Sequence, residues 1–185
     1  HPYGTQTVLG TQENLKNPSI TNIKNYYKQW YVPNNMAICM SGDLDPDATI
    51  ALIDKYFGGL KPNPELPKLD LPKEAPITQP VVKEVLGPDA ESVALAWRFP
   101  GVSDKDFEIL QVVSQVLYNG KAGLIDLDLN QQQKVLNSYG YPMGLADYSA
   151  LLLGGLPKQG QTLEEVKDLL LSEIKKLRAG EFDEK

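Results

Sequence analysis

A proline-rich stretch near the middle of the chain limits the folds that are open to it. Six prolines fall between Lys61 and Pro80, and the residues between them show no helical or alternating apolar period. Proline lacks the N–H group that helices and sheet ladders need, so this stretch is predicted to form a semi-rigid extended connector. The segments on both sides look like parts of one fold, and we therefore predict no domain boundary here.

Capping residues and apolar spacing predict two helices and one strand before the connector. Asn17-Pro18-Ser19 is a helix start, and Asp45-Pro46 is a second one, with Gly58-Gly59 as its stop. Between them lies a short apolar run typical of a buried strand, in which Cys39 is predicted to be a small core residue. The predicted elements are a helix over 18–31, a strand over 36–40 and a helix over 46–57.

The second part of the chain alternates between strand and helix patterns. Gly87-Pro88-Asp89 separates two apolar runs, and Ser103 with Asp106, like Thr162 with Glu165, is a capping-box signature. Strands in sequential pairs with helices between and after them indicate the α+β class, with an antiparallel or mixed sheet and helices packed on one face. The predicted elements are strands over 81–86 and 92–99, helices over 103–118 and 123–133, strands over 135–141 and 148–154, and a closing helix from 162.

The charge balance argues against polyanionic partners. The chain has 18 basic and 24 acidic side chains, for a formal net charge of −6, whereas nucleic-acid affinity depends on Lys and Arg that neutralise phosphates. We therefore predict no nucleic-acid partner. No apolar run approaches the roughly 20 residues that span a bilayer, and the N-terminus lacks the layout of a secretory signal. The chain is predicted to be soluble, in either the cytoplasm or the periplasm, and both of its ends look cut.

The scarcity of histidine excludes the common hydrolytic centres. The only histidine is His1, at the start of the chain. A zinc site with two His ligands, a Ser/His/Asp triad and a Cys/His pair all need an internal histidine. Asp126 and Asp128 lie two positions apart on a predicted helix and therefore do not share a face. We predict no catalytic residue, no metal ligand and no cofactor in this chain.

Several stretches, taken in order, resemble one family of enzymes. The first stretches are His1-Pro2-Tyr3-Gly4, the run 8–15 and the helix end 30–36. They continue with Ser41-Gly42-Asp43-Leu44-Asp45, Tyr56-Phe57-Gly58, Trp97-Arg98-Phe99-Pro100 and Leu117-Tyr118-Asn119-Gly120. Over nearly its whole length the chain resembles the M16 (pitrilysin/insulinase) family of zinc metallopeptidases.

The resemblance implies a supporting part of a larger peptidase. The family's zinc motif, His-x-x-Glu-His, lies upstream of the segment that resembles the start of this chain, so zinc is expected in the full-length enzyme only. Residues 1–17 resemble the tail of the metal-binding subdomain, and residues 18–185 resemble the second, C-terminal type of subdomain, truncated at its C-terminus. Its implied partners are a peptide substrate, the remainder of its own chain and a second M16-type half. The resemblance implies a non-catalytic chamber wall that helps to hold the substrate.

Two other functions are compatible with the same sequence. An inactive scaffold or partner subunit could have kept the fold and lost the metal site. A metabolite-binding domain unrelated to proteolysis would share only the α+β class. The presence of His-x-x-Glu-His in the parent gene, upstream of His1, would favour the peptidase over the scaffold.

The resemblance also points to two sets of site residues. An Arg and, seven residues later, a Tyr contact the substrate in some family halves, and those positions match Asn130 and Asn137 here, although a shift of two residues would bring Tyr139 to the Tyr position. An asparagine cannot offer the charged fork of arginine, so this chain is not predicted to be the Arg/Tyr-bearing half. A loop and a neighbouring strand edge bind the N-terminal part of the peptide in some members, although the same residues could serve packing alone. The matching positions are Asn119, Gly120, Ser138, Tyr139 and Gly140.

Overall fold

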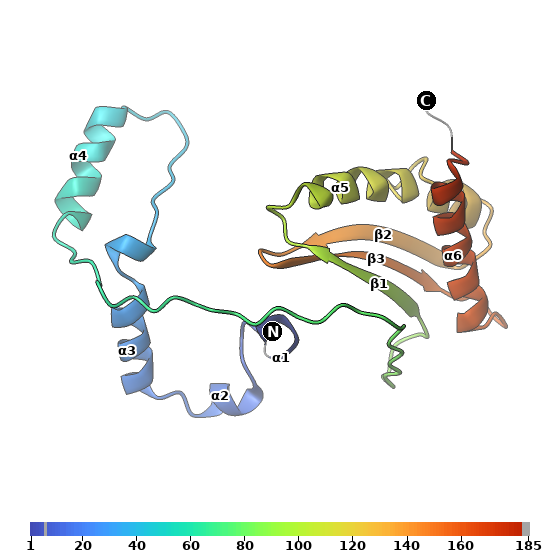
Figure 1. The fold of residues 1–185 in the computed structure, drawn as a ribbon, viewed down its shortest axis with the longest axis horizontal. Helices are drawn as coiled ribbons and strands as arrows, with labels where there is room; N and C mark the ends of the chain where they lie inside the picture. Colours follow the sequence, from blue (N-terminus) through green and yellow to red (C-terminus); the bar gives the residue numbers. More distant parts are fainter. Residues whose placement is uncertain (6, 183–185) are drawn as a thin grey trace. The chain divides into compact units, whose positions relative to one another are not determined.

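The computed structural model describes residues 1–5 and 7–182 (Figure 1). The chain divides into two compact units, His1–Val82 and Lys83–Lys185. The division falls at the end of the proline-rich connector, where the sequence analysis predicts no boundary.

The first unit consists of short helices that are joined by segments without regular secondary structure. The helix predicted over 46–57 is confirmed, because the Asp45 Oδ1 accepts the Ala48 N–H at 2.9 Å and proline occupies the first helical position. The helix predicted over 18–31 is slightly shorter and begins after Ser19, whose hydroxyl caps it. The elements are α1 (Pro2–Thr5), α2 (Gln12–Lys16), α3 (Ile20–Trp30), the short 3₁₀ turn η1 (Pro33–Asn35) and α4 (Pro46–Phe57).

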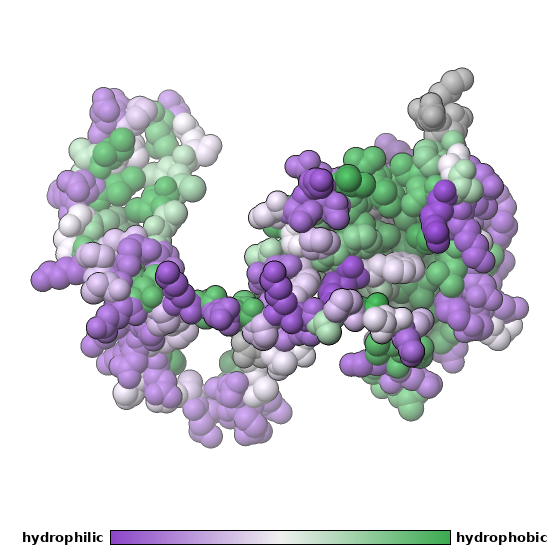
Figure 2. All heavy atoms as spheres, viewed as in Figure 1, coloured by the Kyte–Doolittle hydropathy of each residue, from purple (hydrophilic) through white to green (hydrophobic). Residues whose placement is uncertain are grey.

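The strand predicted over 36–40 is wrong. The segment is extended but pairs with no described strand, and Met40 is 56% exposed. Cys39, predicted to be in the core, is exposed as well. An apolar run becomes a strand only when a neighbouring strand accepts its hydrogen bonds, and none of the described strands lies beside this run. Apolar side chains therefore remain on the surface of this unit (Figure 2).

The second unit confirms the α+β class. Its sheet is antiparallel and has the order β1-β3-β2. The predicted pairing of 81–86 with 92–99 is wrong, because residues 81–86 form no strand and β1 pairs with β3 instead. The elements are β1 (Val93–Pro100), α5 (Lys105–Leu117), the π-helix η2 (Asp126–Gln131), β2 (Asn137–Gly144), β3 (Tyr148–Leu156) and α6 (Leu163–Ala179).

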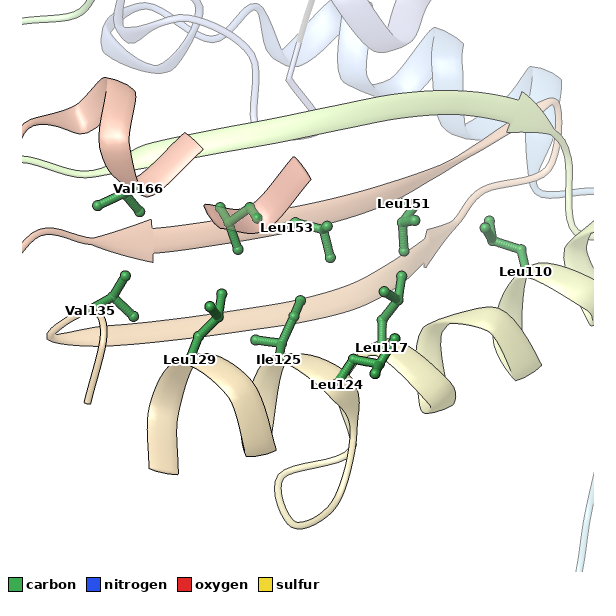
Figure 3. Packing of buried hydrophobic residues seen from close by; sticks show 10 residues of the cluster. Leu110, Leu117, Leu124, Ile125, Leu129, Val135, Leu151, Leu153 and Val166 are labelled. Atoms are coloured by element: carbon green, nitrogen blue, oxygen red, sulfur yellow. The ribbon is translucent and has the colours of Figure 1, made fainter. Parts of the chain in front are cut away.

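All three helical elements of this unit pack on one face of the sheet. Side chains of α5, η2 and α6 meet Leu151 and Leu153 of β3 in one core, as Figure 3 shows for most of its members. Gly155 permits the approach of α6, because a Cβ there would lie 2.5 Å from the Val166 Cγ1. The buried core consists of Leu110, Leu117, Leu124, Ile125, Leu129, Val135, Leu151, Leu153, Val166 and Leu170.

Capping residues explain where the helices of this unit begin. The capping box at Thr162 is confirmed: the Thr162 N–H donates to Glu165 Oε2 at 2.7 Å, and the Glu165 N–H donates to Thr162 Oγ1 at 3.2 Å. At α5 the predicted cap Ser103 is wrong. The cap is Asp104, whose Oδ1 accepts the Asp106 N–H at 2.9 Å. None of the helices in the described part of the chain has the length and hydrophobicity needed to cross a membrane.

Candidate peptide-binding surface

The loop after α5 and the strand β2 meet, as the resemblance implies. Asn119 and Gly120 lie in this loop, and Gly140 lies in β2. A Cβ on Gly140 would come 3.4 Å from the Tyr118 Cβ and 2.7 Å from the Leu153 Cδ2. The absence of a side chain at Gly140 therefore lets the end of α5 lie close against the strand.

A buried carboxylate holds the loop in place. Asp126 Oδ2 accepts the N–H groups of Asn119, Gly120 and Gly123, each at 3.0 Å, and the Asp126 side chain is 5% exposed. Gly120 has a φ of +80° inside this turn, a conformation that favours glycine. No such role of Asp126 is predicted from the sequence, although an aspartate three residues after Gly123 has the spacing of a local side-chain cap. Asp126 thus fixes the loop that carries two of the predicted peptide-binding residues.

The side chain of Asn119 is used within the loop. Its Oδ1 accepts the N–H groups of Lys121 and Ala122 at 3.0 and 2.9 Å, and its Nδ2 donates to the Gln115 carbonyl at 3.1 Å. These bonds occupy the carboxamide at both ends. Because Asp126 also takes the main-chain N–H of Asn119, a main-chain contact of Asn119 with a peptide would use its carbonyl.

The two asparagines at the expected Arg and Tyr positions lie in different surroundings. Asn130, in η2, is half-buried and hydrogen-bonds the main chain of Ser138. Asn137 is exposed at the start of β2. The match of these positions to the family's Arg and Tyr stays a prediction.

The face of the sheet opposite the core carries none of the described helices of the second unit, and it is mostly apolar, with Arg98 lying over the Tyr148 ring. The register of the three strands places Ala94, Ala96, Leu152, Tyr139 and Tyr141 on this face, because paired residues point to the same side. The two tyrosine rings are stacked with centroids 6.1 Å apart, and Tyr141 is 46% exposed. The face thus offers small residues beside two aromatic rings.

The absence of a side chain at Gly154 makes room for one of these rings. Gly154 of β3 is the register partner of Tyr139, and a Cβ on Gly154 would overlap the Tyr139 ring. The ring therefore lies flat over the glycine. Gly154 shapes the bare face, whereas the adjacent Gly155 admits α6 on the core face.

A charged cluster ties η2 to α6 beneath the sheet. Lys176 Nζ donates to Asp128 Oδ2 at 2.6 Å and to the two carboxylate oxygens of Glu173 at 3.0 and 3.1 Å. Glu173 is only 1% exposed, and burial raises its pKa above the ordinary value of 4.5, although Lys176 acts in the opposite direction. The hydrogen bond from Lys176 lowers the pKa of Asp128 below 3.8.

The raised pKa of Glu173 predicts that ionisation of this carboxyl lowers the free energy of unfolding, to an extent that depends on pH. At a pH below the ordinary value of 4.5 the carboxyl is neutral in the folded and unfolded chain, and Glu173→Gln should then differ little from the parent. As the pH rises through the folded pKa, ionisation of the buried group lowers the stability of the parent alone. The free energy of unfolding of the parent minus that of the variant should therefore fall between about pH 4 and 7. Asp128 is present in the parent and in the variant, so its own titration occurs in both. Urea unfolding across this pH range measures the difference in the free energy of unfolding. A difference that rises with pH would contradict the prediction.

The described side chains do not fit a zinc site. No group of three or more His, Cys, Asp or Glu residues within 1–5 and 7–182 is placed to hold a metal ion. The sequence has one histidine, whereas catalytic zinc sites use three converging side chains. We therefore assign no zinc chemistry to these residues.

Comparison with known proteins decides the family. The family model described as "Peptidase M16 inactive domain" matches residues 19–185. The chain belongs to this family. The match spans both compact units of this M16 domain, so the division at Val82 lies inside a single family domain.

The M16 domain is similar to parts of longer proteins. It is 28% identical over 184 residues to the zinc protease PqqE of Helicobacter pylori, covering 95% of this chain and 41% of that protein. It is 33% identical over 73 residues to a probable mitochondrial-processing peptidase subunit beta of Schizosaccharomyces pombe, covering 40% of this chain and 16% of that protein. The chain thus spans less than half the length of these curated relatives.

A solved structure supports the fold. The crystal structure of a protease from Helicobacter pylori matches with a TM-score of 0.74 and 23% identity, over 95% of this chain and 44% of that one. At this identity the match shows the fold alone. The M16 fold that the resemblance implies is therefore confirmed.

Proposed function

We propose that this M16 domain is the substrate-holding, non-catalytic part of a zinc-dependent peptidase that acts on unstructured peptides. The zinc site and the general base would belong to the remainder of the parent chain, since the described residues of this domain offer no such donors. A second M16-type half would close the chamber. The zinc protease PqqE, which the domain resembles over 95% of its length, supports the reaction class.

The bare face of the sheet is the observation that carries the proposal. The described helices of the second unit cover one face, and the register of the strands places alanines and two stacked tyrosines on the other. An extended peptide can lay alternate side chains against such a surface and can pair its main chain with a strand edge. Asn119, Gly120, Ser138, Tyr139 and Gly140 lie where the loop after α5 meets the β2 edge, and we propose them as the peptide-binding region.

Binding of a labelled unstructured peptide tests this proposal. Fluorescence anisotropy of the peptide with the whole chain should give a saturable signal. Tyr139→Ala should weaken binding about five- to tenfold, because an aromatic contact contributes on the order of 1 kcal/mol. Gly154→Ala should weaken it similarly, since the added methyl group displaces the Tyr139 ring.

Tyr56→Ala is the matched control, because Tyr56 is a 69% exposed tyrosine of α4 in the first unit and is not part of the sheet. It should leave the affinity unchanged. Equal weakening by Tyr56→Ala and Tyr139→Ala would contradict a specific role of the sheet face. Absence of any saturable binding would contradict the proposed function itself.

A further inference from the structure

The loop after α5 contains the only Asn-Gly pair in the sequence, Asn119-Gly120. Asparagine is among the chemically labile residues. A glycine after it favours cyclisation, because no side chain hinders the approach of the glycine nitrogen to the asparagine Cγ. Both residues are exposed, so water reaches the pair. The pair therefore has the covalent chemistry needed to form a succinimide ring.

Ring formation needs no reagent other than water. The main-chain nitrogen of Gly120 loses its proton and bonds to the Cγ of Asn119. The Cγ–Nδ2 bond breaks, and the leaving nitrogen takes up the proton and departs as ammonia. Water then opens the ring at one of its two carbonyl carbons, which gives an aspartyl or an iso-aspartyl residue. In the iso-aspartyl product the main chain runs through the former side chain and is longer by one methylene carbon.

The carbon that the nitrogen would attack is already polarised. Asn119 Oδ1 accepts the N–H groups of Lys121 and Ala122 at 3.0 and 2.9 Å. Negative charge develops on this oxygen when a nucleophile adds to Cγ, and N–H donors in such positions stabilise that charge. These two hydrogen bonds therefore favour attack on Cγ, so protection of the pair has to act on the attacking nitrogen.

Asp126 restrains this nitrogen. Its Oδ2 accepts the N–H of Gly120 and the N–H of Asn119, each at 3.0 Å. These bonds fix the peptide planes on both sides of Asn119, so the Gly120 nitrogen cannot turn toward Cγ without breaking them. Loss of the Gly120 proton would also place an anionic nitrogen beside a carboxylate, and a like charge disfavours that form. Asp126 is 5% exposed, so water does not screen its charge well.

We propose that Asn119-Gly120 is a latent modification site, and that the Asp126 carboxylate keeps it intact in the folded chain by holding the Gly120 N–H. Local opening of the loop releases the nitrogen beside a polarised carbon, and cyclisation follows. The iso-aspartyl product cannot restore the loop, because its main chain is longer between the two N–H groups that Asp126 accepts. The modification thus records loop opening irreversibly, whether or not this domain binds a peptide.

Peptide mapping by mass spectrometry tests this proposal on the whole chain, incubated at mildly alkaline pH. The mass change from amide to carboxyl reports reaction at Asn119, and chromatography separates the aspartyl from the iso-aspartyl product. The chain unfolded in urea gives the rate without the loop. The folded parent should react at least about tenfold more slowly than the unfolded chain, because a hydrogen bond to a charged group must first break.

Asp126→Asn is the decisive variant, because it keeps the shape of the side chain and removes its charge. Asn119 should then react about five- to tenfold faster than in the folded parent. Asp168→Asn makes the same substitution at an exposed residue of α6, and it should leave the rate unchanged. Asn137, exposed in β2, is an internal reference whose reaction reports unfolding of the whole unit, and its rate should not change in Asp126→Asn.

Three results would overturn the proposal. A folded parent that reacts as fast as the unfolded chain would show that the loop gives no protection. An Asp126→Asn rate equal to that of the parent would show that the carboxylate is not the protecting group. Equal acceleration of Asn119 and Asn137 in this variant would assign the reaction to unfolding of the whole unit and not to release of Gly120.

Discussion

Replacement of Asp126 by alanine is expected to lower the free energy of unfolding of the second unit by about 3 kcal/mol. The carboxylate accepts three main-chain N–H groups at 3.0 Å, and it is nearly fully buried. Hydrogen bonds to a charged group contribute roughly 1.5–3 kcal/mol each, but the loop can turn part of the freed N–H groups to water. Urea unfolding followed by Trp97 fluorescence, in a chain with Trp30→Phe, measures the change.

Asp126→Asn provides the graded control for this prediction. It keeps one carbonyl oxygen of the same shape and loses the charge, so the loss should be about 1–2 kcal/mol. The free energy of unfolding should be highest for the parent, lower for Asp126→Asn and lowest for Asp126→Ala. A loss below about 1 kcal/mol in Asp126→Ala would show that the carboxylate does not hold the loop.

Replacement of Lys176 by methionine is expected to have an effect of similar size. Methionine keeps the length of the side chain, but it leaves Glu173, which is 1% exposed, without its cation. Removal of one partner of a buried ion pair costs roughly 3–5 kcal/mol, and we expect about 3 kcal/mol here because Lys176 itself is partly exposed. The same urea unfolding at neutral pH measures the loss.

Lys167 supplies a matched control on the same helix. Its side chain is 33% exposed, against 32% for Lys176, but its partner Glu164 is 71% exposed. Lys167→Met should therefore cause no measurable change, because exposed ion pairs contribute little. The double variant Lys176→Met with Glu173→Gln should recover most of the stability. If it is as unstable as Lys176→Met alone, the lone buried charge is not the cause.

Local signals in the sequence were sufficient to predict most of the helices. Asp45 and Pro46 define the start of α4, and the reciprocal Thr162 and Glu165 define the start of α6. Each signal lies within one helical turn and depends little on the rest of the fold. The hairpin of β2 and β3 was predicted for the same reason, since its strands are neighbours in the chain.

Strand pairing over longer distances could not be read from the same patterns. Residues 36–40 and 81–86 have the apolar runs of strands, yet neither pairs with a described strand. Residues 93–100 have a similar pattern and do form β1, because β3 lies beside them although it follows some 50 residues later. Composition shows that a segment can become a strand, but a partner decides whether it does.

The candidate site was located by resemblance, but its contacts were not predicted. Gly120 and Ser138 are predicted from the resemblance, but the side chains that hold them are not. The structure shows that Asp126 fixes the first and Asn130 occupies the edge of the second. The Asp126 contacts are local and have the spacing of a side-chain cap, whereas the Asn130 contact depends on the turn that brings η2 against β2, and no residue pattern in one sequence reports that turn.

The central claim is that this M16 domain holds a peptide but does not cut it. The most direct measurement incubates the whole chain with added zinc and a labelled unstructured peptide, then determines bound metal by atomic absorption and peptide products by mass spectrometry. The account predicts an intact, bound peptide and no stoichiometric zinc. Stoichiometric zinc accompanied by turnover of the peptide would contradict it.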